Sequence, residues 1–433
     1  MFAWQHIKRR IPFTIVVGSL SAAIASSAAL GGQTVNGPMA FEPIAGSAYG
    51  QTTSSWGDAP WIIPDGFRQY LVSDEIDDLG GGGGLDIYAG VDDLTDMNTV
   101  NETGKWAGRF LYRTHEQDTN GAVSVVDLQT GASKVLVKQG EGVDETGLPW
   151  RDLDGLVWTP WGTLLFAEED PQGHVFEIVL DPQDPSTAVA VYDRPALGLI
   201  RHEGIEVGPG GAVYVIDELN GGSIFRFVPD RRGDLSSGQL YALKISGISD
   251  AAQVWNSGND RTGAFEWIAL DQAQAMIDAK VAADAVNATE YGRPEDVEMI
   301  GSILYVANTT EDRVIAIDLN SNTVATFVQK GLNVPVENSG ASITGFNNPD
   351  NLADGPDGRL WIVEDNFASD IWVADKDLDG DGAADGVNLF ASLKDSGAEG
   401  TGIYFGTDPH TLFVNLQHTA ADRDGTWAIT NRR

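Results

Sequence analysis

The sequence predicts an all-β protein, a six-bladed β-propeller with a short helical insertion. Two observations support this fold. From Trp61 onward, short apolar runs of roughly four to seven residues alternate with Gly, Asp, Asn and Pro, as in chains of many short strands. One segment, a glycine turn followed by alternating apolar residues and a polar or acidic end, also recurs at intervals of roughly forty to sixty residues. A repeat of this size is large enough for the four strands of a propeller blade.

The recurring segment has five copies. They are PWGTLLFAEED (160–170), GPGGAVYVIDE (208–218), MIGSILYVANTT (299–310), GPDGRLWIVEDN (355–366) and GTDPHTLFVNLQH (406–418). A further unit, GRFLYRTHEQ with GAVSVVDLQTGASKVLV (108–137), precedes them with a less regular start. The last unit ends with the short strand TWAIT (426–430), so we expect the early strand FRQYLVSD (67–74) to complete that blade. A β-sandwich followed by a second β domain is the alternative, and the regular recurrence favours the propeller.

The region around residues 250–290 interrupts the repeat. It contains LDQAQAMIDAKVAADAV (270–286), in which Ala, Leu, Met and Ile have helical spacing. We therefore expect a helical insertion within a single propeller domain over residues 61–433. The sequence leaves open whether this insertion covers a site as a lid or is a surface addition.

The N-terminus has the pattern of an export signal. Three basic residues (8–10) precede an apolar run and a stretch of small residues, with cleavage expected after Ala28. The expected organisation is a signal peptide over residues 1–28, a flexible linker over residues 29–60 and an exported, periplasmic or extracellular mature protein. Arg9-Arg10 could mark twin-arginine export, and an uncleaved anchor is the alternative to a signal peptide.

Composition narrows the range of partners and metals. The chain has 27 basic and 63 acidic residues, a formal net charge of −36 at pH 7, so nucleic acid and anionic membranes are not expected partners. It has no cysteine and six histidines, so metal ligands must be mostly oxygen atoms, which hard cations such as Ca²⁺ prefer. Many of the acids have the simpler interpretation of a solvating surface. We expect a monomer.

Polar residues recur at equivalent positions of the repeats, and equivalent positions of a propeller converge at one mouth of its central channel. The set comprises His115-Glu116; Asp152, Asp154 and Glu168-Glu169; Arg201-His202-Glu203; Arg293, Glu295 and Asp296; Asp350-Asn351 and Glu364-Asp365; and Glu399 with Gln417-His418. Carboxylates that face one channel repel one another unless cations or protons compensate. The pattern therefore favours a cluster of metal ions, with Glu116, Asp154, Glu169, Asp350 and Asn351 among the expected ligands.

Several of these segments resemble the signature segments of the PhoX-type alkaline phosphatases. In chain order they are WIIPDGFRQYLVSDE, DGLVWTPWGTLLFAEE, RHEG, GRPED, NPDNLADGPDGRLWI and EGTGIYFGTDPHTLFVNLQH. Each motif is weak alone and specific in combination, and together they extend over nearly all of the chain after the linker. The resemblance implies a six-bladed propeller, twin-arginine export, and phosphomonoester hydrolysis at a cluster of iron and calcium ions.

The resemblance assigns roles residue by residue. Glu203 and Glu295 match glutamates that ligate the metals, Arg293 matches an arginine that contacts phosphate, and Asp350 matches a calcium-binding aspartate. We expect Arg293, Glu203 and Glu295 to be the catalytic residues. The arginine fork suits phosphate oxygens, and glutamates can bridge cations.

The chain departs from the family pattern at one metal ligand. Leu153-Asp154 stands where family members have Asn-Cys, and that cysteine is an iron ligand. An aspartate supplies a harder oxygen ligand, so Ca²⁺ is the expected cofactor and Fe³⁺ is a further candidate.

A second calcium candidate lies outside the channel, in the segment DKDLDGDGAADG. It places acids at positions 375, 377, 379, 381 and 385 around glycines (Asp375, Asp377, Asp379, Asp381 and Asp385). Acids at alternate positions around a glycine turn can wrap one cation, as in an EF-hand loop, although the closing glutamate is missing. An acidic hairpin turn is the alternative.

The leading functional hypothesis is an exported metal-dependent phosphatase that acts on small phosphate esters. One alternative is a calcium-dependent propeller hydrolase of another class, such as a lactonase. Another is a calcium-stabilised propeller without catalysis that binds a partner. An essential Arg293 would favour phosphate over a lactone as the substrate.

Overall fold

In the computed structural model, the described residues are 37–48, 52–76, 84–89, 91–334, 345–366, 368–395, 397–420 and 423–431. They all lie in the unit Thr34–Arg433. The predicted signal peptide (1–28) lies outside the described residues. In the described part of the chain, no helix combines the length and the apolar character that a membrane crossing requires.

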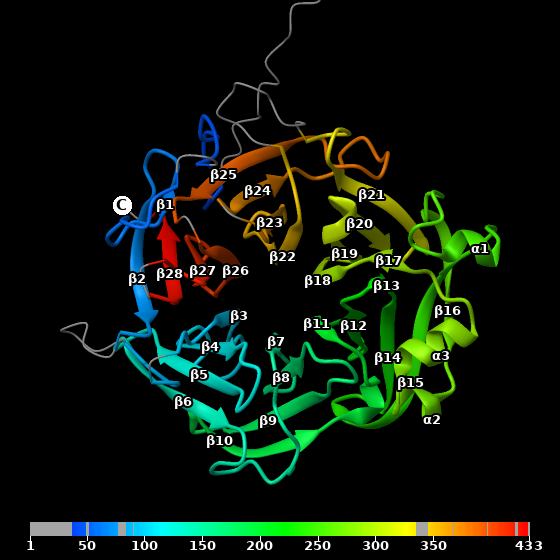
Figure 1. Cartoon of the computed structure of the whole chain (residues 1–433), viewed down its shortest axis with the longest axis horizontal. Coiled ribbons are helices and arrows are strands. Elements are labelled where there is room, and N and C mark those ends of the chain that lie inside the picture. Colours follow the sequence, from blue (N-terminus) through cyan, green and yellow to red (C-terminus); the bar gives the residue numbers. More distant parts are fainter. Residues whose placement is uncertain are drawn as a thin grey trace, which may run out of the picture. The chain divides into compact units, whose positions relative to one another are not determined.

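Antiparallel sheets surround a central axis in this unit (Figure 1). The four-stranded and five-stranded sheets each turn one edge strand towards the axis, and the nine-stranded sheet turns both of its edge strands towards it. The innermost strands are β3 (Thr95–Val100), β7 (Leu153–Trp158), β11 (His202–Val207), β18 (Pro294–Ile300), β22 (Pro349–Asp354) and β26 (Glu399–Phe405). In this order each innermost strand contacts the next, and β26 contacts β3, so the ring is closed. The prediction of an all-β, propeller-like fold is confirmed.

The other strands extend each sheet outward. They are β4 (Phe110–His115), β5 (Ala122–Asp127) and β6 (Ala132–Lys138) after β3; β8 (Thr163–Glu168), β9 (Val175–Asp181) and β10 (Asp184–Asp193) after β7; β12 (Val213–Asp217), β14 (Ile224–Arg231) and β15 (Asp234–Ile245) after β11; β19 (Ile303–Asn308), β20 (Arg313–Asp318) and β21 (Thr323–Gln329) after β18; β23 (Leu360–Glu364), β24 (Asp370–Ala374), β25 (Val387–Leu393) and β1 (Trp61–Ile62) after β22; and β27 (Thr411–Gln417), β28 (Gly425–Thr430) and β2 (Arg68–Asp74) after β26. Each copy of the recurring segment supplies the second strand of a sheet, namely β8, β12, β19, β23 and β27. Two short strands, β13 (Asn220–Gly222) and β17 (Tyr291–Gly292), pair with each other.

The last sheet is completed by the early strand, as the sequence predicts. β2 pairs antiparallel with β28, with Leu71 opposite Trp427. Trp427 is fully buried in an apolar cluster that also contains Trp61 and Trp361. This pairing joins the early strand to the last sheet through backbone hydrogen bonds and a shared core.

The insertion differs from the single helix predicted over residues 270–286. It contains α1 (Asp250–Gln253), the strand β16 (Gly263–Ala269), α2 (Gln272–Ala275) and α3 (Ala279–Ala285). Asp278 breaks the predicted helix, because its side chain caps the backbone N–H of Val281 and starts a new helix there. β16 pairs with β15 and with β21, so two neighbouring sheets are joined into one nine-stranded sheet. The remaining elements are the 3₁₀ turns η1 (Pro195–Leu197) and η2 (Thr309–Glu311).

The described part of the predicted linker (29–60) packs on the sheets. Met39 is fully buried and Trp56 is 8% exposed. The Trp56 ring contacts Trp427 edge to face, and its indole N–H donates to the Asp395 carboxylate. Burial of these apolar side chains stabilises the packed position of the chain, so the described part of residues 29–60 belongs to the folded unit.

Candidate metal centre

Every innermost strand has a register shift in its pairing with the next strand of its sheet. The shifts lie between Thr95 and Asn98, Leu153 and Leu156, His202 and Ile205, Pro294 and Val297, Pro349 and Leu352, and Thr401 and Tyr404. Such bulges re-aim side chains. In five of these strands the first residue inside the shift is acidic, namely Asp96, Asp154, Glu203, Glu295 and Asp350. The recurring acids of the sequence therefore share one structural position.

Glycines behind two of these acids allow the strands to approach closely. A Cβ atom on Gly155 would lie 2.0 Å from the backbone oxygen of Glu203, and one on Gly204 would lie 2.1 Å from Oδ1 of Asp296. The two residues of each Asp-Gly or Glu-Gly pair therefore have different roles. The acid supplies the carboxylate, and the glycine allows the next strand to approach.

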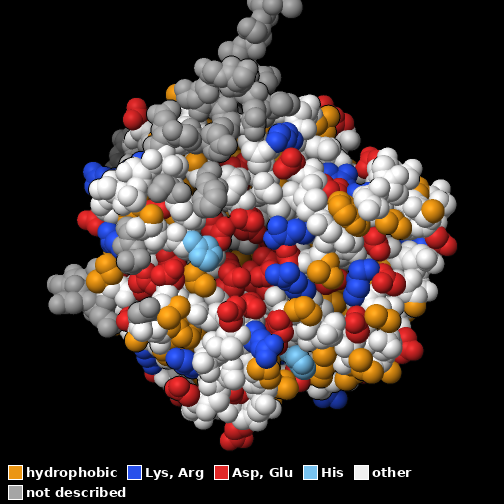
Figure 2. Space-filling view, in the orientation of Figure 1, with side chains coloured by type: hydrophobic (Ala, Val, Ile, Leu, Met, Phe, Trp, Pro, Cys, Tyr) orange, Lys and Arg blue, Asp and Glu red, His pale blue; other side chains and the backbone are white. Residues whose placement is uncertain are grey.

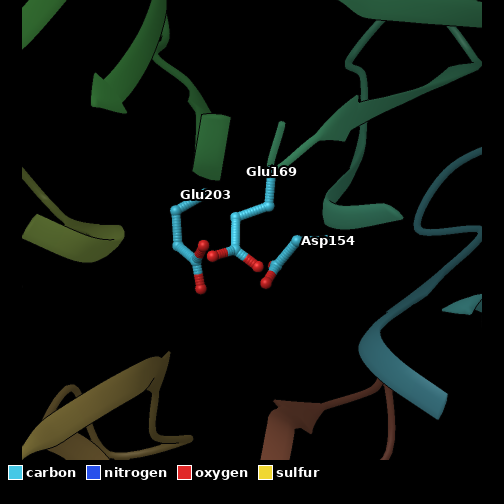
Figure 3. Close-up of side chains that lie close together, drawn as sticks. All are labelled: Asp154, Glu169 and Glu203. Atoms are coloured by element: carbon cyan, nitrogen blue, oxygen red, sulfur yellow. The ribbon is translucent and has the colours of Figure 1, made fainter. Parts of the chain in front are cut away.

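The carboxylates converge into two groups. One consists of Asp154, Glu169 and Glu203, and the other of Glu203, Glu295 and Asp350; within each group one oxygen per residue lies within 4.8 Å of the others. Figure 3 shows the first group, with three side chains from different strands and loops pointing to one place. Glu203 belongs to both groups, as a bridging ligand between two cations would.

The site is electrostatically unbalanced without cations. Burial, with a contribution from repulsion by Glu116, raises the pKa of Asp154 to about 7. Burial and then repulsion by Asp154 hold the pKa of Glu203 well above its usual value. Oδ1 of Asp154 and Oε2 of Glu203 are buried and have no hydrogen-bond partner within the described residues. Buried acceptors without donors, all of them oxygen, fit a hard cation.

Two arginines lie beside the carboxylates and share one buried glutamate. Arg293 Nε is 2.5 Å from Oε1 of Glu218, and Arg201 Nε is 2.7 Å from its Oε2. Arg293 Nη2 is also 3.0 Å from Glu295, and Arg201 also pairs with Glu169. Figure 2 shows acidic side chains gathered around a central hollow, with basic side chains along one side of it. Both arginine side chains are about one-third exposed, so an anion at the carboxylate groups can reach them.

Two other predicted ligands, Glu116 and Asn351, have hydrogen-bond partners of their own beside the carboxylate groups. Oε2 of Glu116 accepts a hydrogen bond from Gln417, 3.2 Å away. The Asn351 side-chain oxygen accepts the backbone N–H of Gly402 at 2.5 Å and so ties β22 to β26.

The acidic loop after β24 gathers only part of its predicted set. Asp377, Asp379 and Asp385 bring their oxygens within 4.8 Å of one another. Asp375 instead lies 3.4 Å from Arg359, and Asp381 accepts the backbone N–H of Ala383 at 2.8 Å. The alternate spacing of the sequence therefore yields three converging carboxylates out of the five.

Sequence reasoning missed Asp96 and Glu218. Asp96 is 4% exposed, and burial and then repulsion by Asp154 hold its pKa well above the usual range. It occupies the same bulge position as the other acids, but its strand precedes the first unit and lacks the recurring segment, so alignment of the repeats did not reach it. Glu218 closes the copy GPGGAVYVIDE, where its acidic end was the available signal.

A separate cavity of about 650 Å³ lies around the later residues of the innermost strands. Glu206, Glu298 and Asp354 line it together with Trp158 and Tyr404. Burial, with repulsion by Glu102, raises the pKa of Glu206 to about 8. Glu206 is three residues beyond Glu203 on β11, and it belongs to neither carboxylate group of the metal centre.

Replacing Glu206 with glutamine should change how stability depends on pH. The folded-state pKa is above the usual value, so the folded protein retains a proton that the unfolded chain releases. The wild type therefore loses stability as the pH rises from about 4.5 towards 8, and Glu206→Gln lacks this loss. Thermal unfolding with constant calcium should show a variant more stable by about 1–3 kcal/mol at pH 8.5 and by much less at pH 5. Parallel pH profiles for the two proteins would contradict the assignment.

Comparison with known proteins gives one family. The family model described as alkaline phosphatase PhoX matches residues 170–420, more than half of the chain. The matched range includes Glu203, Arg293, Glu295 and Asp350, whereas Asp154 lies before it. No curated protein matches the sequence.

Solved structures share the fold. PhoX of Pseudomonas fluorescens, in complex with vanadate, a transition state analogue, has a TM-score of 0.65 at 19% identity, with 90% of this chain and 97% of that chain covered. A catalytically inactive virginiamycin B lyase variant of Staphylococcus aureus, in complex with quinupristin, has a TM-score of 0.42 at 13% identity, with 84% and 99% covered. Only the first similarity is high enough to support the fold.

Proposed function

Because this chain belongs to the alkaline phosphatase PhoX family and is therefore a phosphoric ester hydrolase, we propose that it hydrolyses small phosphate monoesters at cations held by its innermost strands. The observation that carries this proposal is the position of Arg293 and Arg201 beside two carboxylate groups that share Glu203. The fold we propose is a six-bladed propeller, in which the nine-stranded sheet counts as two blades joined by β16.

The residues of the chain divide the work between them. Asp154, Glu169, Glu203, Glu295 and Asp350 would hold the cations, which supply positive charge to polarise the phosphoryl oxygens. Arg293 and Arg201 would donate hydrogen bonds to the same oxygens and stabilise the charge that develops there. Glu218, 2% exposed, would hold both guanidinium groups in place after cations have taken over Glu169 and Glu295.

Calcium is the cofactor that this donor set supports best. Both groups of the centre offer carboxylate oxygens only, and the residue in place of the family's cysteine is Asp154. Hard oxygen ligands suit Ca²⁺, and the missing thiolate weakens the case for iron at this position. Asp377, Asp379 and Asp385 would hold a separate, structural calcium ion.

The position of the two arginines also favours a phosphate ester over a lactone as the substrate. A neutral lactone needs no cationic partner, whereas a phosphate dianion must overcome a chain with a formal net charge of −36 at pH 7. Two arginines at the mouth of the site supply that local attraction. We further propose an exported, monomeric protein, periplasmic or extracellular, with residues 1–28 removed as a signal peptide.

Calcium removal and return test the proposed function. The purified protein should hydrolyse a generic phosphomonoester, lose at least about 100-fold in rate after chelation and dialysis, and recover on addition of Ca²⁺. Vanadate should inhibit the calcium-loaded protein, because it mimics the transferring phosphoryl group. Absence of hydrolysis by fully calcium-loaded protein would contradict the proposal, and recovery with iron alone would contradict the choice of metal.

A further inference from the structure

Arg293 has a backbone conformation that few residues adopt. Its φ is +49°, in the left-handed region that side chains other than glycine usually avoid. Its N–H donates to the Leu219 carbonyl, and its carbonyl accepts the N–H of Thr309, both at 3.0 Å. The direction of its side chain therefore depends on contacts that hold the backbone on both sides of Cα.

The residue before Arg293 is held by a side chain. Gly292 N–H donates to Oε1 of Glu311 at 2.8 Å. A Cβ atom on Gly292 would lie 3.0 Å from Glu311 Cγ and 3.2 Å from the Trp255 ring, so glycine is what lets Glu311 reach this backbone. Glu311 lies in η2, and Gly292 lies in the short strand β17.

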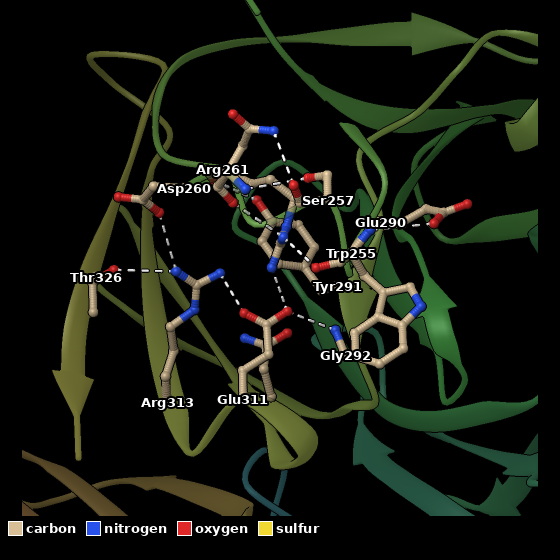
Figure 4. Close-up of polar contacts among 12 residues, drawn as sticks. Trp255, Ser257, Asp260, Arg261, Glu290, Tyr291, Gly292, Glu311, Arg313 and Thr326 are labelled. Carbon is tan, nitrogen blue, oxygen red and sulfur yellow. Dashed lines mark hydrogen bonds and ion pairs between the residues drawn. The ribbon is translucent and has the colours of Figure 1, made fainter. Parts of the chain in front are cut away.

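Glu311 is in turn fixed by two buried arginines (Figure 4). Arg261 Nη2 lies 2.6 Å from Oε1 and Arg313 Nη2 lies 2.6 Å from Oε2. The arginine side chains are 5% and 6% exposed, so this pairing is shielded from water. Arg261 also donates to the Trp255 backbone oxygen at 2.5 Å. The contacts that hold Glu311 therefore extend into the insertion at residues 250–290.

Tyr291 adds a third contact to the same strand. The Arg261 and Arg313 guanidinium groups lie 5.5 and 5.8 Å from the centre of its ring. Its hydroxyl donates to the Arg261 backbone oxygen at 3.0 Å. Both residues of β17 are therefore held by the same two arginines, one through a ring and the other through Glu311.

We propose that Glu311, clamped by Arg261 and Arg313, is a positioning residue that sets the direction of the Arg293 side chain. In this view the insertion supports the wall of the site from behind rather than covering its mouth. The expected effect on hydrolysis rests on the proposed function, whereas the expected effect on the backbone at Gly292 and Arg293 does not.

The test uses Glu311→Gln in the full chain. Glutamine has the shape of glutamate but only one acceptor oxygen, whereas the Gly292 N–H and two guanidinium groups face this side chain. Amide hydrogen exchange of Gly292 and Arg293 should become at least about tenfold faster. With calcium present, kcat/KM for a phosphomonoester should fall roughly tenfold. The same substitution in an Arg293→Ala background should change kcat/KM by less than about twofold, because the residue through which it acts is gone.

Asp260→Asn is the matched control. Asp260 pairs with Arg313 at 3.2 Å and is 65% exposed, and the Gly292 N–H donates to Glu311 and not to Asp260, so its replacement should leave exchange and activity unchanged. If Glu311→Gln does not fold, Glu311→Asp keeps the charge and shortens the reach, and the same measurements apply.

Exchange and kinetics separate the possible failures. Unchanged exchange in a folded Glu311 variant would overturn the positioning role, whether or not the protein is a phosphatase. Faster exchange with equal losses of kcat/KM in both backgrounds would overturn action through Arg293. A wild type without phosphatase activity would count against the proposed function, and exchange alone would then decide whether Glu311 positions Arg293.

Discussion

Glu203→Gln should lower phosphomonoester hydrolysis by at least about 1,000-fold, the largest effect expected of any single substitution in this protein. Glu203 is the one residue shared by both carboxylate groups, so its replacement weakens cation binding in each. Metal analysis of the variant should show that the cations are lost. The lower rate is therefore expected to come from missing cations.

The same substitution should have the opposite effect on the stability of metal-free protein. Burial, and then repulsion by Asp154, hold the pKa of Glu203 well above its usual value, so the metal-free fold disfavours the charged carboxylate. Glutamine carries no charge at this place, and chelated Glu203→Gln should therefore unfold at a temperature equal to or above that of chelated wild type.

Glu206→Gln is the matched control for activity. It makes the same chemical change three residues further along β11, at the separate cavity, and should leave hydrolysis unchanged. A Glu203→Gln variant that retains both its cations and its activity would contradict the shared-ligand assignment.

Arg293→Ala should lower kcat/KM by about 100- to 1,000-fold while the metal content stays at the wild-type level. Arg293 reaches Glu218 and Glu295 from a left-handed backbone, and Arg201 approaches Glu218 from its other oxygen, so it does not replace the contact of Arg293 with Glu295. Arg293→Lys should recover part of the loss, because lysine keeps the charge and lacks the planar fork.

Arg151→Ala provides the comparison. Arg151 is 48% exposed and forms a surface ion pair with Asp170 at 3.6 Å. It does not contact Glu218, unlike Arg293 and Arg201. Its removal should therefore leave kcat/KM within about twofold of wild type. Equal activity of Arg293→Ala and wild type would show that Arg293 does not contact the reacting phosphate.

The fold was largely predictable because each sheet repeats the same local pattern. The glycine turn and alternating apolar residues of PWGTLLFAEED become β8, and the four later copies become β12, β19, β23 and β27. The closing strand was predictable because the last unit lacked one strand and residues 67–74 had strand character. The insertion was not, since the cap at Asp278 divides a helix that composition alone makes continuous.

The site was predictable where the repeats are regular. Asp154, Glu203, Glu295 and Asp350 follow from their equivalent positions in the units, and the structure brings them together in two groups. Asp96 was missed because its strand precedes the first recognisable unit. The pairing of Glu218 with two arginines depends on β13 and β17, a contact between distant segments that no local pattern encodes.

Elemental analysis of the purified mature protein shows whether the innermost strands hold cations through Glu203 and its neighbours. After exhaustive dialysis, we expect calcium at one ion or more for each of the two carboxylate groups, and a loss of those ions in Glu203→Gln. Metal-free wild type, or wild type and Glu203→Gln with the same metal content, would contradict it.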